Sequence, residues 1–272
     1  MTDALFFSTL QAQTQDARNA MLSAPIFEAC RRGQVELNTY TAFLVQAYHH
    51  VKHTVPLLMA CGARLPEKYE WLRQDIGEYI EEEKGHHEWI LNDLNKCGFD
   101  AGQARHNVGE GAVGLPIEMM VAYLYHQIDR KNPMAFFGMV WVLEGTSVSV
   151  GGDMAKLVKH LLGLPDAAMS YLTSHSTLDV EHIGFFESLM NKITDPADQK
   201  AIVDGANVCL PCMDRCFAIC LFCLPLRRRR RKYGTERKAD FADWCNRWDW
   251  QGDCQSTGSA RRGAGVGWPQ CQ

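Results

Sequence analysis

Helical periodicity is the sequence feature that most limits the fold of this chain. From the N-terminus to about residue 208, apolar residues recur at helical spacing, and no alternating strand pattern of four or more residues stands out. This pattern predicts an all-α protein, a compact bundle of about seven to eight helices. Helices are expected over residues 3–22, 24–33, 38–62, 66–97, 115–131, 133–149, 153–163, 165–193 and from 195 onward.

Capping residues, prolines and glycines set the expected helix boundaries. Asn38 and Thr39 form a helix-start signal, and Pro56 should kink the helix that follows. Cys97-Gly98 should end the fourth helix, and Gly151-Gly152 should break the chain between two later ones. The glycine-rich segment 99–114 is expected to be a loop that crosses the bundle or serves function.

Composition excludes several classes of protein. A hydrophobic fraction of 46%, a charged fraction of 22% and a net charge of −4 are typical of a globular protein that does not bind nucleic acid. No apolar run reaches the roughly 18 residues of a membrane span. The N-terminal stretch has an acidic residue and no basic region, unlike a signal peptide, so the expected location is the cytoplasm.

The late helix carries a group of metal-binding residue types. His175, Asp179 and His182 stand at positions i, i+4 and i+7 of the stretch TSHSTLDVEHIGFF. On an α-helix this spacing places all three on one face within about two turns. Two imidazoles and a carboxylate that converge from one face suit iron.

Two upstream helices add further candidates. Glu83 and His86, in EEEKGHHEWILNDL, form a Glu-x-x-His pair, a spacing used by carboxylate-bridged dimetal sites in helical bundles. Glu144 lies in the apolar run FFGMVWVLEGTSV, where an unpaired carboxylate would be costly to bury without a counter-charge. The three imidazoles and three carboxylates together form a ligand set for two metal ions rather than one.

Structural alternatives stay open for each part. A Glu-x-x-His pair on its own is more often solvated than functional. Glu144 can take its counter-charge from a salt bridge to another helix, although no Arg or Lys lies within one helical turn of it. Glu82 or His87 can replace Glu83 or His86, because the pairs 82/86 and 83/87 have i, i+4 spacing.

Residues 209–272 differ in character from the rest of the chain. They hold eight of the 11 cysteines, and 12 Lys and Arg against six Asp and Glu. We expect residues 1–208 to form the helical domain with the dimetal site, 209–224 a short residual helix and 225–272 a disordered tail. Joint enrichment in Arg, Cys, Trp and Gly without helical periodicity is typical of an out-of-frame, GC-rich coding stretch.

Three functional interpretations of this tail stay open beside that one. Five consecutive arginines can contact nucleic acid or an anionic membrane, and the Trp-rich end can be an interaction module. A cysteine group can bind zinc or an iron–sulfur cluster, and its members are Cys209, Cys212, Cys216, Cys220 and Cys223.

At these six candidate ligands the sequence resembles the haem-oxygenase-like diiron oxidases and oxygenases, the superfamily of iron-containing redox enzymes. Members take a Glu and a His from an early core helix, a Glu from a middle helix and His-x3-Asp-x2-His from a late one. The likeness covers about residues 15–208 and includes the Leu-Glu-Gly context of Glu144. It implies a haem-oxygenase-like helical bundle, the fold shared by type II thiaminases, pyrroloquinoline quinone synthase and haem oxygenases.

The resemblance also implies an activity and its cofactors. It implies an iron-dependent oxidoreductase with two Fe ions, alternating between Fe(II) and Fe(III), and O2 as co-substrate. Imidazole ligands would need neighbouring acceptors that fix their tautomers. One iron would be held by Glu83, His86 and His175, and the other by Asp179 and His182, with Glu144 as a bridging or second-iron carboxylate.

A catalytic side chain and a substrate class follow less directly. Tyr171, four residues before His175, is the candidate catalytic residue, as a hydrogen-bond donor to bound oxygen or as a redox-active phenol. The family acts on amino acids, amino-acid-derived groups and fatty acids. Candidate cations for a substrate carboxylate are Arg130, Lys131, Lys156 and Lys159.

The expected partner is a small-molecule substrate. An electron donor and a homodimer are compatible with this role, whereas nucleic acid and membrane are not expected.

Two alternative functions stay open. One is a metal-free thiaminase-like hydrolase or cofactor-ring oxidase on the same fold, although Cys61 does not obviously fit as its nucleophile. The other is a non-catalytic iron- or ligand-binding helical protein.

Overall fold

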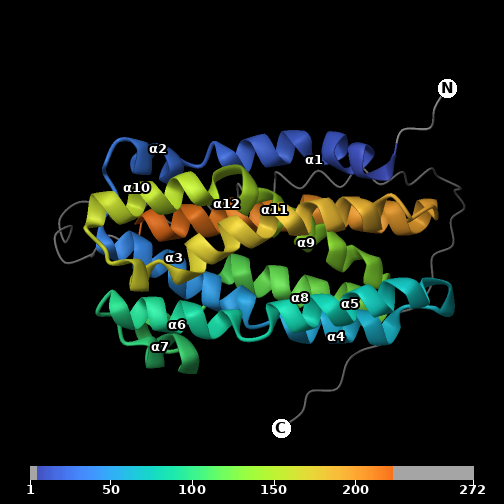
Figure 1. The fold of residues 1–272 in the computed structure, drawn as a ribbon, viewed down its shortest axis with the longest axis horizontal. Helices are drawn as coiled ribbons and strands as arrows, with labels where there is room; N and C mark the ends of the chain where they lie inside the picture. The colour runs from blue at the N-terminus through green and yellow to red at the C-terminus, as the bar shows by residue number, and fades with distance from the viewer. Residues whose placement is uncertain (1–4, 223–272) are drawn as a thin grey trace, which may run out of the picture. The chain divides into compact units, whose positions relative to one another are not determined.

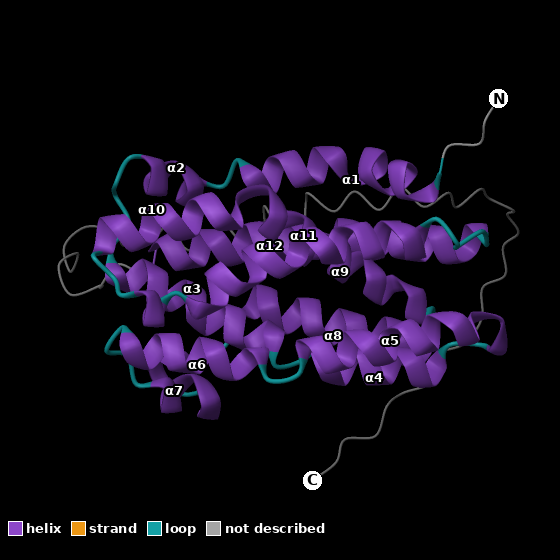
Figure 2. Cartoon of the chain, in the orientation of Figure 1, coloured by secondary structure: helices purple, strands orange, loops and turns teal. Residues whose placement is uncertain are grey.

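The computed structural model describes residues 5–222, and within them all side chains except those of residues 175–181. The described part is helical and has no strand (Figure 2). Short 3-10 helices join several of the α-helices, and η4 is a π-helix. The elements are α1 (Phe6–Leu22), α2 (Pro25–Arg31), α3 (Leu37–Val51), α4 (Thr54–Arg64), η1 (Glu67–Tyr69), α5 (Glu70–Glu83), α6 (His86–Lys96), α7 (Ala101–His106), η2 (Gly109–Gly111), α8 (Leu115–Arg130), η3 (Pro133–Ala135), α9 (Phe136–Thr146), η4 (Ser147–Gly151), α10 (Gly152–Leu162), η5 (Asp166–Ala168), α11 (Ser170–Met190) and α12 (Pro196–Phe222).

The helices surround α12, which packs against α1, α3, α8 and α9. Figure 1 shows α1 and α2 along one side of the bundle and α4 to α7 along the opposite side. Residue 208, the expected end of the helical domain, falls inside α12 rather than at an element boundary. The second half of α12 is part of the core, because Cys209, Met213, Phe217 and Cys220 are buried. The expected tail 225–272 and Cys223 lie outside the described residues.

Two glycines allow α9 and α12 to pack closely. A Cβ atom on Gly138 would lie 2.3 Å from the backbone nitrogen of Ala206, and one on Gly205 would lie 2.2 Å from the carbonyl oxygen of Ala135. Any residue other than glycine is therefore excluded at both positions. This close contact holds α9, which carries Glu144, against the central helix.

The expected helix over residues 38–62 is two helices. α3 ends at Val51 and α4 begins at Thr54, so the break lies upstream of Pro56. The reason is that a proline clashes with the carbonyl four residues earlier, here that of Lys52, and cannot donate to it. The predicted cap at Asn38 and Thr39 was also displaced, since the residue preceding the helix is Glu36.

Glycines produced two further differences from the expected boundaries. The helix expected over residues 66–97 is interrupted at Gly85, whose φ of +90° is a left-handed conformation. Cys97-Gly98 ends α6 as predicted. Gly151-Gly152 does not break the chain: η4 joins α9 to α10 as a π-helix. The segment 99–114 is not a simple loop, because it contains α7 and η2.

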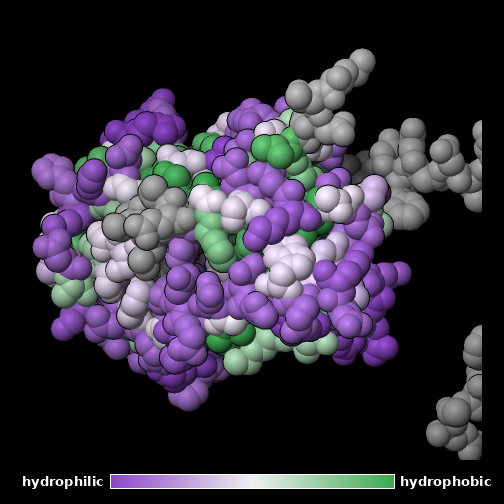
Figure 3. Space-filling model, turned by 45° about the vertical axis from the view of Figure 1, so that its right-hand side comes forward, coloured by the Kyte–Doolittle hydropathy of each residue, from purple (hydrophilic) through white to green (hydrophobic). Residues whose placement is uncertain are grey.

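One helical stretch within the described residues, Pro133–Leu162, has the length and mean hydropathy of a membrane span. Its most apolar window is 67% buried inside the bundle, as the core helix of a globular protein would be. On the face shown in Figure 3, hydrophilic residues cover most of the surface and hydrophobic residues form small separate groups.

Candidate metal centre

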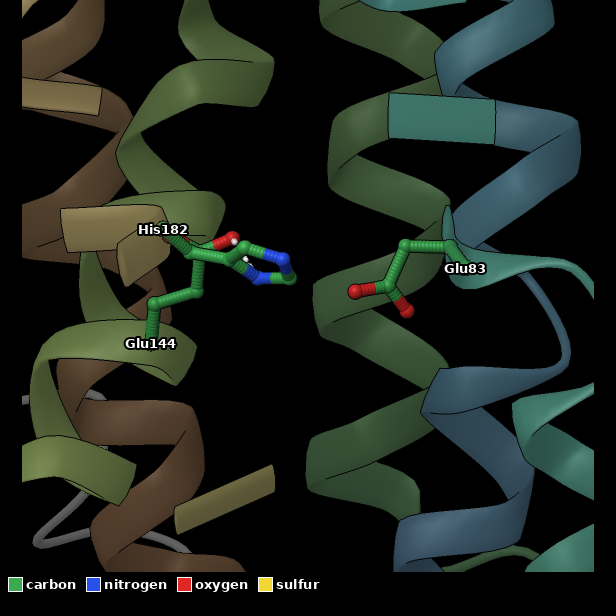
Figure 4. Close-up of side chains that lie close together, drawn as sticks. All are labelled: Glu83, Glu144 and His182. Atoms are coloured by element: carbon green, nitrogen blue, oxygen red, sulfur yellow. Dashed lines mark ion pairs between the residues drawn. The ribbon is translucent and has the colours of Figure 1, made fainter. Parts of the chain in front are cut away.

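Three buried side chains from three helices meet inside the bundle. Glu83 at the end of α5, Glu144 on α9 and His182 on α11 each offer a ligand atom, and these atoms lie within 4.8 Å of one another. Figure 4 shows Glu83 pointing from one side of the site toward Glu144 and His182 on the other. Each residue is only 8% exposed. This is the one such group of three or more metal-binding side chains in the described part of the chain.

The local sequence places Glu144 in the interior. Almost every residue of α9 is buried, so the helix has no polar face that could carry this carboxylate to solvent. A buried, ionised carboxylate requires compensating donors or positive charge. Tyr79 supplies one donor: its hydroxyl donates to Oε2 of Glu144 at 3.2 Å. Burial, together with the charges of Glu144 and Glu83, raises the pKa of the Tyr79 phenol, so it remains protonated as a donor.

His86 lies beside Glu83 although the two residues belong to different helices. The left-handed turn at Gly85 ends α5 and starts α6 at His86, which brings Nδ1 of His86 to 3.1 Å from Oε2 of Glu83. The His86 ring stacks on Trp89 at a centroid distance of 4.1 Å. The Glu-x-x-His pair therefore spans the turn between α5 and α6, and does not lie on one face of a single helix as expected.

His182 contacts two carboxylates. Its Nε2 lies 3.2 Å from Oε2 of Glu82, and its Nδ1 lies 3.9 Å from Oε1 of Glu144. When the proton is on Nε2, this N–H can donate a hydrogen bond to Glu82. The lone pair of Nδ1 is then directed to the site. Glu82, considered above as an alternative ligand, is thus placed at the outer side of His182 rather than among the three converging groups.

The donor set fits a divalent transition metal. Carboxylate oxygen and imidazole nitrogen are the donors used by iron, manganese and zinc sites. Two donor atoms on one such ion, each bound at about 2.0–2.2 Å, lie at most about 4.4 Å apart. The ligand atoms of Glu83, Glu144 and His182 lie no more than 4.8 Å apart, which is close to this value. Small side-chain movements would therefore let Glu83, Glu144 and His182 bind a single ion.

The remaining predicted ligands are only partly described. His175 and Asp179 belong to α11, but their side chains lie outside the described part of the structure. The structure therefore brings together Glu83, Glu144 and His182, with His86 adjacent to Glu83. The assignment of the six ligands to two ions stays a prediction.

An apolar cavity of about 180 Å³ adjoins the site. Its lining includes Glu83, Glu144, Tyr79 and His50. Tyr171, the predicted catalytic residue, also lines the cavity, where its ring lies 6.4 Å from that of Phe43. Tyr171 precedes His182 by 11 residues, about 16 Å along a helix, whereas Tyr79 contacts Glu144 directly.

Sequence reasoning missed Tyr79. Its only sequence signal is its position four residues before Glu83, which places both on one face of α5. The basic residues predicted to bind a substrate carboxylate do not line the cavity. Its lining residues in the described part include no Lys or Arg. Lys159 pairs instead with Asp166, and Arg130 pairs with Asp129.

The cysteines in the described part of the chain form no comparable centre. Cys209, Cys212, Cys216 and Cys220 are free thiols along α12, and no group of three metal-binding side chains within the described residues includes any of them. Cys61 is fully buried, donates to the carbonyl of Pro133, and does not line the cavity. Burial raises the pKa of its thiol to about 12, which disfavours the reactive thiolate.

Fold and site together define a helical bundle with a buried carboxylate–imidazole centre. A family model for iron-containing redox enzymes matches residues 41–213. The chain therefore belongs to this haem-oxygenase-like family of iron-containing redox enzymes. None of the curated protein sequences is significantly similar to it.

Solved structures confirm the expected all-α, haem-oxygenase-like fold. A domain with a heme oxygenase-like fold from Shewanella denitrificans is similar with a TM-score of 0.69 and 19% identity, over 81% of this chain and 93% of that one. A TenA homolog from Pseudomonas syringae has a TM-score of 0.65 and 10% identity, over 79% and 92%. Heme oxygenase-1 from Synechocystis, in complex with heme, has a TM-score of 0.62 and 15% identity, over 79% and 92%.

Proposed function

We propose that this protein is a non-haem diiron oxidase or oxygenase that uses O2 to oxidise a small, largely apolar metabolite. The observation that carries the proposal is the convergence of Glu83, Glu144 and His182, all buried, beside an apolar cavity. Membership of the family of iron-containing redox enzymes supports iron as the metal. When bound, iron supplies the redox chemistry that couples reduction of O2 to oxidation of the substrate.

In this proposal the side chains have separate tasks. Glu83, Glu144 and His182 bind metal, and each is drawn from a helix that the core holds in place. Tyr79 orients Glu144 through its hydroxyl, and Glu82 orients His182 through Nε2. His86, which lies adjacent to Glu83, would join His175 and Asp179 in completing the set of six ligands for two ions.

The cavity lining supports an apolar substrate among the classes that the resemblance implies. Its lining is mainly aliphatic and aromatic, and its described residues contribute no Lys or Arg that would neutralise a separate substrate anion. A strongly polar amino-acid substrate would lose hydration there without compensation. An apolar group directed away from the carboxylates is therefore favoured, and the same apolar walls exclude water from the reacting atoms.

Two structural observations speak against a thiaminase-like hydrolase. The buried Cys61 thiol does not line the cavity and has a raised pKa. Cys30 lines the cavity, but on the short helix α2, and burial raises the pKa of its thiol as well. Neither thiol is activated as a nucleophile would be.

The test is anaerobic Fe(II) loading of the full chain, with iron counted by elemental analysis and O2 consumption followed afterwards. We expect two iron ions per chain and Fe-dependent O2 consumption. His182→Ala and Glu144→Gln should each lose at least one iron and consume little O2 while circular dichroism remains helical. The matched control is Glu81→Gln, an exposed carboxylate on the same helix as Glu83 that pairs with Lys84.

Unchanged O2 consumption in both site variants would contradict the proposal. If the wild type binds iron through these residues but oxidises it only slowly, without rapid O2 consumption, the protein is an iron-binding protein rather than an oxygenase. If the protein binds no iron but is still active, this result would favour the metal-free alternatives, a thiaminase-like hydrolase or a cofactor-ring oxidase.

A further inference from the structure

The cavity beside the metal centre is elongated along the bundle. Glu144 and Val158 both line it, and Val158 follows Glu144 by 14 positions along the continuous helical path α9–η4–α10, about 20 Å at the usual rise per residue. On α3, His50 and Thr39 also both line it, about 16 Å apart by the same measure. A ligand that fills this space must therefore be long and narrow.

The walls between the two ends are mainly apolar, although the hydroxyl side chains of Thr54, Thr146 and Ser147 also line the cavity. Along α9, η4 and α10 the lining residues include Leu143, Val150 and Met154, and α12 contributes Met213. Among the described lining residues, the carboxylates are Glu83 and Glu144, both at the metal centre. The cavity volume of about 180 Å³ exceeds the roughly 150 Å³ that admits benzene in an apolar cavity. The space suits an extended hydrocarbon group.

The end of the cavity remote from the carboxylates is closed by buried side chains of α2, α10 and α12. Phe27 and Phe217 meet there edge to face at a centroid distance of 5.2 Å. Phe217 also contacts Phe43, 6.5 Å away, which lies farther along the cavity wall. The side chains at this end are each less than a tenth exposed, namely Ile26, Phe27, Cys30, Val158 and Phe217.

We propose that Phe217, supported by Phe27, determines the length of the apolar substrate group that the enzyme accepts. This inference rests on the proposed function for its biological meaning, but it concerns residues far from the metal ligands. Phe217 is the side chain that joins the closed end to the middle of the cavity through its two ring contacts. A smaller residue there extends the cavity toward α2, and a larger residue at Val158 shortens it from the side of α10.

The test measures binding of straight-chain primary alcohols of increasing length to the full chain by calorimetry. These probes are uncharged and need neither iron nor turnover. Each methylene that the cavity admits should tighten binding about fourfold, from roughly 0.8 kcal/mol per buried methylene. In the wild type the gain should stop at a limiting length. Phe217→Leu and Phe217→Ala should move this limit to longer alcohols, and Val158→Phe should move it to shorter ones.

Phe99→Leu is the matched control, since Phe99 packs partly buried against the core but does not line the cavity. Its limiting length should equal that of the wild type. If Phe217→Ala does not fold, Phe217→Leu and Val158→Phe test the same statement. An identical limit in all variants, or no binding of any alcohol, would overturn this proposal without touching the iron site. Shifted limits in a protein that binds no iron would instead refute the proposed function and leave this inference standing.

Discussion

Tyr79 is the residue that the structure adds to the candidate site. Its hydroxyl donates to Glu144, and its ring lies 5.8 Å from that of His182, so one side chain touches two of the three converging groups. Hydrogen bonds of this kind fix the orientation of a metal-binding carboxylate before the metal arrives. In the proposed function, Tyr79 would therefore act through Glu144 rather than as a ligand.

Tyr79→Phe should weaken Fe(II) binding by about 10- to 100-fold, the usual cost of removing a partner of a metal ligand. The aromatic ring is retained, so the fold should persist. Competition with a chromophoric chelator under anaerobic conditions measures the affinity. Tyr123→Phe is the control, because Tyr123 is a partly buried tyrosine on α8 that does not line the cavity. Equal affinities of Tyr79→Phe and wild type would show that this hydroxyl has no role in metal binding.

The single residues of the site were predictable to different extents. Glu144 could be found from sequence because a carboxylate inside an apolar helix is costly and stands out. The contact of Tyr79 could not, since a tyrosine on a helix usually packs in the core and its hydrogen-bond partner depends on how α5 and α9 meet. Likewise, the i, i+3 spacing identified Glu83 and His86, but their contact arises from the turn at Gly85.

At the scale of helices, α11 is positioned by a residue of another helix. Asp93 on α6 is fully buried and accepts hydrogen bonds from the backbone nitrogens of Ser170 at 3.1 Å and Tyr171 at 2.8 Å, and from the Ser170 hydroxyl. It therefore caps the start of the helix that carries His182. The sequence did not reveal this cap, because the capping residue is 77 positions away from Ser170.

Asp93→Ala should lower the free energy of unfolding by about 2 kcal/mol, since it leaves buried backbone donors of α11 without their acceptor. Asp93→Asn should cost less, because its amide oxygen can still accept.

Burial raises the pKa of Asp93, so wild-type stability should fall as pH rises from the ordinary carboxyl pKa toward the pKa in the folded protein. Urea unfolding across the acid range checks both statements, and Asp93→Asn should lose that part of the pH slope. A slope unchanged in Asp93→Asn would refute the assignment.

At the scale of the whole molecule, periodicity predicted the fold class, and the solved structures confirm it. The length of α12 was not predicted, because the helical domain was expected to end at about residue 208, whereas the buried side of this helix continues to Cys220. What periodicity could not show is where one helix becomes two. The breaks at Lys52–His53 and Gly85 depend on one proline clash and one left-handed glycine, and η4 keeps two glycines within a continuous helix.

The α7–η2 segment is joined to the rest of the bundle by a histidine that should make stability depend on pH. His49 on α3 is buried, its Nε2 lies 2.7 Å from the carbonyl oxygen of Gly111, and the ammonium of Lys52 lies 3.1 Å from its Nδ1. Burial lowers the pKa of His49 below its ordinary value of 6.5; the contact with the Gly111 carbonyl opposes this shift, and Lys52 adds a smaller lowering effect. Burial also lowers the pKa of His53, which lies 3.2 Å from the Tyr125 hydroxyl.

Because these two imidazoles bind protons more weakly in the folded protein, the unfolded chain takes up more protons as pH falls below about 6.5. The free energy of unfolding should therefore decrease from pH 6.5 downward until the folded pKa values are passed. Urea unfolding between about pH 7.5 and pH 5 measures this slope. His49→Gln should reduce it, whereas His106→Gln, at the exposed end of α7, is the control. An equal slope in His49→Gln and wild type would show that the contact between α3 and η2 is not the pH-sensitive one.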